Sequence, residues 1–317
     1  MLLLLFSFKE VLSKDNQISY AFITNQLSNS LDVIDLNKLE KINEINVGNK
    51  PAGIHVDKET KSVFVTNPGS NNISIVNIET NEIKTVDGLE SPIGIVLSKN
   101  KELLFVTNWY KNLISIIDIK KAKIIDEIYS GESPAGIVTH PLDGNIIVAN
   151  KNGHNVSIFD REELQLIKKI KVGRSPFGVT IDSKGNYIYV TNVQSNSISV
   201  INYDKKKVVK TISVGKWPYS IAIDEVNKKL FVTNQRSNSI SVIDLDNLKK
   251  IKEISDFCEY PEGINIHSKK NIVIVACWFN DEVAIMNLLD YSLIKKISVS
   301  GGPRAFGKFI IENLTIK

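Results

Sequence analysis

The chain has 317 residues, of which 43% are hydrophobic and 23% are charged, an ordinary balance for a globular protein. Its net charge of +4, from 39 basic and 35 acidic residues, is too small to argue for nucleic-acid binding by itself. The two cysteines exclude a disulfide-rich scaffold and leave the cellular compartment open.

The first sixteen residues precede everything that repeats in the chain. They begin with an apolar run, MLLLLFSF, which is far too short to span a bilayer. A secretory signal would use such a run, although no Lys or Arg precedes the leucines and no A-x-A cleavage site follows them. We expect residues 1–16 to be a truncated signal peptide or a disordered N-terminus. The expected location is periplasmic or extracellular, with the cytoplasm as the alternative.

From about residue 17 onward, one phrase recurs with a period of 41 to 43 residues. Each copy ends a short apolar run with Asn, or with Cys in the last copy, and a Pro recurs at nearly the same period. The two sets are Asn25, Asn67, Asn108, Asn150, Asn192, Asn234 and Cys277, and Pro51, Pro92, Pro134, Pro176, Pro218, Pro261 and Pro303. Such a period is typical of repeat architectures. Because no linker interrupts it, we expect residues 17–317 to form a single domain.

One unit, residues 176–217, contains four short segments rich in Val, Ile, Thr and Tyr, with turn residues between them. Their composition, their length and the turn residues between them predict β-strands. No stretch shows the spacing of apolar residues that a helix requires. The unit is therefore a four-stranded antiparallel meander, whose strands we call A to D in chain order. Seven such units predict an all-β fold, a seven-bladed β-propeller.

The ends of the chain predict how this ring closes. Residues 51–302 contain six complete units, residues 18–50 contain only strands B, C and D, and a strand A follows at residues 305–312. An open solenoid has no reason to split one unit between its ends. In a closed ring, the C-terminal strand A joins the N-terminal strands B, C and D and removes their exposed edge. Strand D should be the outer edge of each blade, where many of the lysines collect.

The phrases FVTNPGSNNISIVN, YVTNVQSNSISVIN and FVTNQRSNSISVID resemble the YVTN family β-propeller repeat. The resemblance covers nearly the whole chain and implies a seven-bladed propeller like the β-chain of quinoprotein amine dehydrogenases. It implies no catalytic residue, because the shared positions build the blades. The chain departs from the pattern at Ala149 and at residues 276–279, where the motif Asn is lost.

Residues beside each repeated Pro and after each motif Asn should converge on one face, around the central channel. These positions contain eight of the 24 aromatic residues, including all three tryptophans, although turns usually favour Gly, Asn or Ser. Aromatic rings with a few charges in a concavity are typical of ligand and peptide sites. The alternative is that the rings fill the seams between blades. The candidate binding residues are Trp109, Tyr110, Phe177, Trp217, Tyr219, Arg236, Tyr260, Glu262, Trp278, Phe279 and Arg304.

The two cysteines belong to the same predicted blade. Cys258 precedes strand A and Cys277 ends strand B, so we expect the antiparallel pairing to bring them within reach of a disulfide if the protein is exported. The four histidines do not cluster, and C-x-x-C-H is absent from the sequence. We therefore expect no metal site, no cofactor and no catalytic residue.

The favoured function is a non-catalytic binding propeller, monomeric and without a membrane span. Its aromatic and Arg-bearing face would bind a protein partner or a small ligand. The first alternative is a propeller subunit or accessory protein of a periplasmic quinoprotein-type dehydrogenase. Single-stranded nucleic-acid binding is a third hypothesis, which the lack of concentrated positive charge disfavours.

Overall fold

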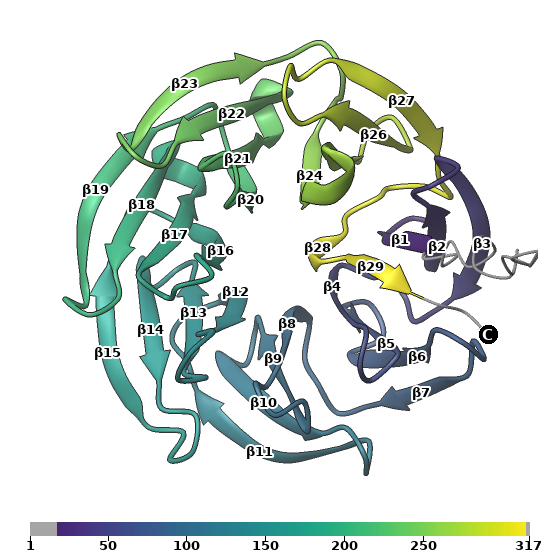
Figure 1. The fold of residues 1–317 in the computed structure, drawn as a ribbon. Helices are drawn as coiled ribbons and strands as arrows, with labels where there is room; N and C mark the ends of the chain where they lie inside the picture. The colour runs from purple at the N-terminus through teal and green to yellow at the C-terminus, as the bar shows by residue number, and fades with distance from the viewer. Residues whose placement is uncertain (1–17, 315–317) are drawn as a thin grey trace, which may run out of the picture.

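The computed structural model describes residues 18–314, which form one closed ring of seven β-sheets around a central channel (Figure 1). The expected signal peptide or disordered N-terminus at residues 1–16 lies outside the described residues. Each sheet is a propeller blade, with strand A innermost and strand D at the outside of the ring. Within the described range, no helix is long and apolar enough to cross a membrane.

Blades 2 to 7 each contain four strands that are consecutive in the chain. Blade 2 contains β4 (Gly53–Asp57), β5 (Ser62–Asn67), β6 (Asn72–Asn77) and β7 (Ile83–Val86). Blade 3 contains β8 (Pro92–Leu97), β9 (Leu103–Asn108), β10 (Leu113–Asp118) and β11 (Lys123–Tyr129). Blade 4 contains β12 (Pro134–Thr139), β13 (Ile146–Asn150), β14 (Asn155–Phe159) and β15 (Leu166–Lys171).

The second half of the ring repeats the same order. Blade 5 contains β16 (Pro176–Ile181), β17 (Tyr187–Asn192), β18 (Ser197–Asn202) and β19 (Lys207–Ser213). Blade 6 contains β20 (Pro218–Asp224), β21 (Lys229–Asn234), β22 (Ser239–Asp244) and β23 (Lys249–Ile254). Blade 7 contains β24 (Pro261–His267), β25 (Ile272–Cys277), β26 (Glu282–Asn287) and β27 (Leu293–Ser298).

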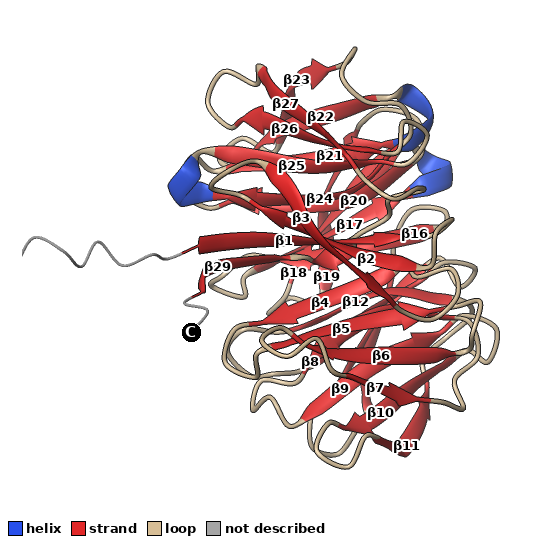
Figure 2. Cartoon of the chain, turned by 90° about the vertical axis from the view of Figure 1, so that its right-hand side faces the viewer, coloured by secondary structure: helices blue, strands red, loops and turns tan. Residues whose placement is uncertain are grey.

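Single-turn 3-10 helices occupy three of the turns that connect these strands. Two of them, η1 (Val193–Ser195) and η2 (Gln235–Ser237), lie in turns between strands B and C, and η3 (Ser268–Lys270) lies in a turn between A and B. In the side view, two of these helices are on one side of the ring and the third is on the other (Figure 2). The two kinds of turn therefore mark the two faces of the propeller.

Blade 1 closes the ring, and its four strands come from both ends of the chain. Strands β1 (Ile18–Asn25), β2 (Ser30–Asp35) and β3 (Glu40–Asn46) supply B, C and D, and β29 (Ile310–Leu314) pairs antiparallel with β1 as strand A. This confirms the closure that the sequence predicts. The closing segment is longer than one strand, however, and its first part, β28 (Phe306–Lys308), leaves blade 1 and pairs parallel with β4 of blade 2.

The inner strands are buried because their two faces pack against neighbouring blades. In β5 and β13 every residue is buried, and apolar residues of blades 4 and 5, such as Val156 and Ile188, share one core cluster. The outer strands are exposed along most of their length, as in β23, where only Ile254 is buried. Lysines on this edge discourage pairing with another chain.

The Thr of the repeated phrase ties each blade to the next one. In blade 5, Thr191 Oγ1 accepts a hydrogen bond from the Gly178 amide at 2.7 Å and donates one to the Tyr219 carbonyl of blade 6 at 3.0 Å. Equivalent bonds from blades 1, 2, 3 and 6 reach the following blade at 2.8 to 3.0 Å. Blades 4 and 7 carry Ala149 and Ala276 at this position and cannot make the bond.

Candidate functional site

A cavity of about 750 Å³ opens at one mouth of the channel, on the face of the turns between strands B and C. The residues that follow the repeated prolines reach it from strand A, and those that follow the motif Asn residues reach it from the turns. Nine of the eleven candidate residues line this cavity, which we call the bowl. They are Trp109, Tyr110, Phe177, Tyr219, Tyr260, Glu262, Trp278, Phe279 and Arg304, and Lys50 and Lys151 join them.

The floor of the bowl is a cluster of aromatic rings that plugs the channel. The Phe177 ring stacks on Tyr219 with centroids 4.1 Å apart, and it lies 4.8 Å from the ring of Phe306. Trp109 of blade 3 lies 6.1 Å from Phe177 and belongs to the same cluster. Phe177 and Phe306 are buried. They therefore support the floor of the bowl and present little surface to a ligand. The sequence analysis did not select Phe306, because it lies three residues beyond Pro303.

An ion pair beside this floor fixes two charged candidates. The Arg304 guanidinium donates to both carboxylate oxygens of Glu262, at 2.6 and 3.2 Å, and to the Tyr219 hydroxyl at 2.9 Å. The Glu262 side chain is 2% exposed and also accepts a hydrogen bond from Gln235 Nε2 at 2.8 Å. Burial disfavours the Arg304 cation, but the Glu262 charge outweighs it and holds the pKa of Arg304 above its usual range. The two side chains therefore satisfy each other and leave little net charge.

Lys50 and Lys151 carry the charges that the ion pair does not cancel, and Lys151 is the more buried of the two. Its Nζ lies 4.8 Å from the centroid of the Trp109 ring, in a cation–π contact. Burial lowers the pKa of Lys151, and no carboxylate within residues 18–314 forms an ion pair with it. Lys151 is not among the candidates predicted from the sequence, although it directly follows the motif Asn150. A partly buried amine without a counter-ion, at the wall of an aromatic cavity, can hold an anionic group of a ligand.

The rim of the bowl carries the most accessible rings. Tyr110 is 70% exposed and Phe279 is 66% exposed, which is unusual for side chains of this size. Trp278 is less exposed than either ring and lies 5.9 Å from the ring of Tyr260, and its Nε1 donates to Gln26 Oε1 at 3.1 Å. Because Gln26 belongs to blade 1, this bond covers the seam between blades 7 and 1. Trp278 therefore serves both the seam and the wall of the bowl.

Trp217 and Arg236 lie outside the bowl, in a separate cleft of about 390 Å³ between blades 5 and 6. The Arg236 guanidinium lies 3.7 Å from the centroid of the Trp217 ring, and Arg174 and Lys216 line the same cleft. These two candidates therefore line a different cavity from the other nine, and Trp217 also packs against the core cluster that contains Phe177.

Cys258 and Cys277 form a disulfide in the structure, with their Cα atoms 5.3 Å apart. In four of the other six blades the cysteine positions hold Gly and Asn, whereas blades 1 and 3 have Ser300 and Leu89 in place of the Gly. A Cβ on Gly215, for example, would lie only 2.6 Å from the Asn234 side chain, so the packing in blade 6 admits no side chain there. Asn234 donates to Ser241 at 2.9 Å, and blade 7 has Ala284 at the position of that serine. The disulfide of blade 7 therefore stands where blade 6 has the contact of Gly215, Asn234 and Ser241. All three positions differ in blade 7.

This substitution predicts how blade 7 responds to loss of its cysteines. Replacing both cysteines by Ser should lower the free energy of unfolding by about 2 to 3 kcal/mol, because the bond closes a loop of 19 residues. Restoring the pattern of the other blades with Cys258→Gly, Cys277→Asn and Ala284→Ser should recover part of that loss. Urea unfolding of both variants measures the difference. Equal stability of the double Ser variant and the unaltered protein would contradict the prediction.

The described part of the chain offers no set of metal ligands. Among residues 18–314, no group of three or more His, Cys, Asp or Glu side chains could hold a metal ion. The bowl contains one carboxylate, that of Glu262, which is already paired. Its chemistry is therefore that of aromatic surface, hydroxyl groups and amines.

The chain is similar to one protein family and to several solved structures. Residues 166–268 match the family model described as lactonase, 7-bladed beta-propeller. No curated protein matches the chain. Among solved structures, a functionally unknown protein from Desulfotomaculum acetoxidans DSM 771 is similar with a TM-score of 0.79 and 14% identity, over 92% of this chain and 98% of that one.

Two enzymes share the fold at similarly low identity. A Kuenenia stuttgartiensis hydrazine synthase aligns with a TM-score of 0.74 and 18% identity, over 83% of this chain and 92% of that one. The dihydro-heme d1 dehydrogenase NirN, in complex with DHE, aligns with a TM-score of 0.65 and 11% identity, over 90% of this chain and 74% of that one. The chain is a seven-bladed β-propeller, similar over residues 166–268 to the lactonase propeller family.

Proposed function

We propose that this protein is a binding propeller whose bowl holds a small ligand with a flat, mostly apolar body and one negative charge. Lys151 carries this proposal, because its amine lies beside Trp109 without a carboxylate partner within the described residues. An anionic ligand group would supply the missing counter-ion.

The shape and lining of the bowl favour a flat ligand. Its volume of about 750 Å³ is within the range of small-molecule sites. Rings from blades 3, 5, 6 and 7 surround it, so a planar group would find stacking surfaces on several sides. The bidentate pair of Arg304 with Glu262 fixes the polar wall before a ligand arrives. A preformed site of this kind loses little entropy on binding.

A flat carboxylate is a direct probe of the proposal. We expect 2-naphthoate to bind and to quench the fluorescence of the tryptophans, of which Trp109 and Trp278 line the bowl. Lys151→Met should weaken 2-naphthoate by about tenfold, the equivalent of about 1.4 kcal/mol. The same change should barely alter binding of 2-naphthamide, which has no charge. Isothermal titration calorimetry measures both affinities.

Lys121→Met is the matched control for this experiment. Lys121 is an exposed lysine at an outer turn, where it pairs with Asp118 at 3.2 Å, so its loss should leave both affinities unchanged. If Lys151→Met weakened the acid and the amide equally, the charge of Lys151 would not be what the ligand uses. Failure of 2-naphthoate to bind at millimolar concentration would remove the proposal.

We also propose that the protein works in the periplasm or outside the cell. Support comes from the disulfide, because such bonds persist mainly in oxidising compartments. Mass spectrometry of alkylated protein from its native cells tests this proposal. Two free thiols would count against it.

A second candidate function is an accessory role in a redox enzyme system. The likeness to a hydrazine synthase and to a dihydro-heme d1 dehydrogenase in complex with DHE supports it, although at 18% and 11% identity that likeness concerns the fold alone. A planar tetrapyrrole would also suit an aromatic bowl. Titration with haemin should then give a shifted Soret band that 2-naphthoate reverses, and an unshifted band would exclude this candidate.

A further inference from the structure

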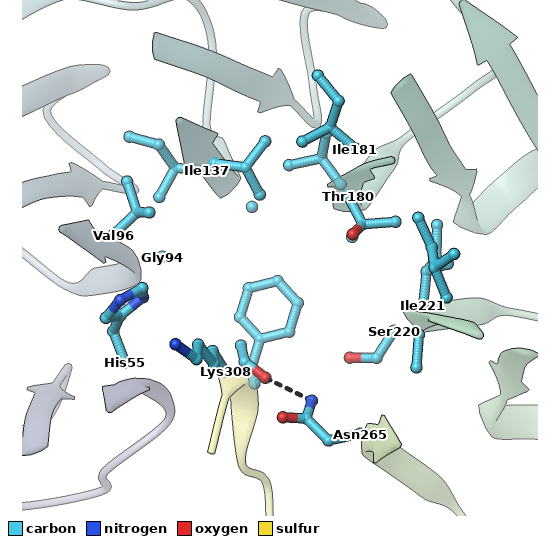
Figure 3. A pocket seen from close by; sticks show the side chains of 18 of the residues that line it. His55, Gly94, Val96, Ile137, Thr180, Ile181, Ser220, Ile221, Asn265 and Lys308 are labelled. Atoms are coloured by element: carbon cyan, nitrogen blue, oxygen red, sulfur yellow. Dashed lines mark hydrogen bonds between the residues drawn. The ribbon is translucent and has the colours of Figure 1, made fainter. Parts of the chain in front are cut away.

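A second cavity, of about 480 Å³, occupies the channel on the far side of the aromatic plug. Figure 3 looks into it and shows side chains from the inner strands of several blades around a common space. Isoleucines such as Ile137, Ile181 and Ile221 make much of the wall, and His55 and Lys308 lie beside each other on one side. The cavity wall therefore combines isoleucines with polar side chains such as Thr180 and Ser220, and it is basic at one place.

The irregular closure of the ring brings the two basic residues, His55 and Lys308, together. Strand β28 leaves blade 1 and pairs in parallel with β4, and the register sets Lys308 directly beside His55. The other inner strands follow the repeat and make no such pair. In this segment the chain gives up part of the regular pairing between strands A and B of blade 1. Places where a sequence departs from its own regular pattern are often functional.

Asn265 of blade 7 holds the irregular segment from its other side. Its Nδ2 donates to the Gly307 carbonyl at 2.9 Å, and its Oδ1 accepts the Phe309 amide at 3.0 Å (Figure 3 shows the first of these bonds). The segment is thus fixed between blades 2 and 7, and these bonds fix the backbone on both sides of Lys308.

Both basic side chains lack partners within the described residues. No hydrogen bond joins either ring nitrogen of His55 to residues 18–314, and no carboxylate among these residues forms an ion pair with Lys308. Burial, assisted by the Lys308 charge, lowers the pKa of His55 to about 3. The imidazole is therefore neutral at physiological pH and has one N–H to donate. Glu225, the carboxylate that lines the same cavity, accepts the Ser183 amide at 2.7 Å.

We propose that this channel is a second ligand site, which takes an aliphatic carboxylate with its chain along the isoleucines and its head between Lys308 and His55. The Lys308 ammonium supplies the counter-charge, and the His55 N–H donates a hydrogen bond to the carboxylate. The alkyl chain replaces water against the apolar wall. This site is independent of the bowl, because the rings of Phe177, Tyr219 and Phe306 lie between them.

Sodium octanoate is the probe for this site. Isothermal titration calorimetry should show that octanoate binds and that octanamide binds at least tenfold more weakly. Lys308→Met should weaken octanoate by tenfold or more. His55→Leu should also weaken it, whereas His55→Gln, which keeps an N–H donor, should retain most of the affinity.

The two lysines serve as controls for each other. Lys151→Met should leave octanoate binding unchanged, and Lys308→Met should leave 2-naphthoate binding unchanged. Circular dichroism melting of each variant identifies any loss caused by unfolding. Octanoate binding that depends on Lys151 and not on Lys308, or no binding at millimolar octanoate, would overturn the channel site and leave the function of the bowl untouched.

Discussion

A chain that ends at Ser300 should yield no soluble, folded monomer. It lacks β28 and β29, so the inner edge of β1 is left open to pairing with other chains. It also lacks five buried apolar side chains, each worth about 1.5 to 3 kcal/mol, and their sum is comparable to the entire stability of a typical protein. Size-exclusion chromatography and circular dichroism of the expressed chain measure the outcome. The lost side chains are Phe306, Phe309, Ile310, Ile311 and Leu314.

A circular permutant separates the contribution of the closing strand from its position in the chain. Ile18 and Leu314 are register partners, so a short turn can join them. The chain is then opened between Ser300 and Gly301. In the resulting order, the four strands of every blade follow one another in the chain. This permutant should fold as the natural chain does. A permutant that fails while the chain ending at Ser300 folds would show that we have misplaced the closure.

The sequence predicts most of the fold because the fold is repeated seven times. Each strand is marked by Val and Ile, and each blade by one Pro. In five of the seven blades the Thr of the motif makes the same bond to the next blade, as Thr191 does to Tyr219. A single short apolar segment can be read as a strand or as part of a buried helix. Seven copies at a constant period favour the strand. The division of the closing segment into β28 and β29 was not predictable, because it occurs once and follows no period.

The candidate site was predictable only as a face of the ring. Repeat positions show which residues reach the channel mouth, and nine of the eleven candidates do line the bowl. Repeat positions do not show how neighbouring side chains pair. Glu262 and Arg304 are 42 residues apart and bind each other, and Trp217 turns into a different cleft from Tyr219, two residues away. Such pairing depends on side-chain direction, which a one-dimensional pattern does not contain.

Arg304→Ala should lower the free energy of unfolding by about 3 to 5 kcal/mol, because it leaves the Glu262 carboxylate buried without its counter-ion. The Glu262 side chain is 2% exposed while Arg304 covers it, and in the variant only water of the bowl can take the place of the guanidinium. The Tyr219 hydroxyl loses the hydrogen bond that Arg304 donates to it, so the wall of the bowl loses a second contact. Urea unfolding followed by circular dichroism measures the change.

Two further variants decide whether the buried charge is the cause. Arg236→Ala removes an exposed arginine that also lies on an aromatic ring, and it should change stability by less than about 0.5 kcal/mol. Combining Arg304→Met with Glu262→Gln removes both charges and keeps an amide for Gln235, so most of the lost stability should return. If the double variant were as unstable as Arg304→Ala, packing of the arginine stem would be responsible instead. Unchanged stability of Arg304→Ala would instead mean that Glu262 needs no counter-ion, and Arg304 would then be free to contact a ligand.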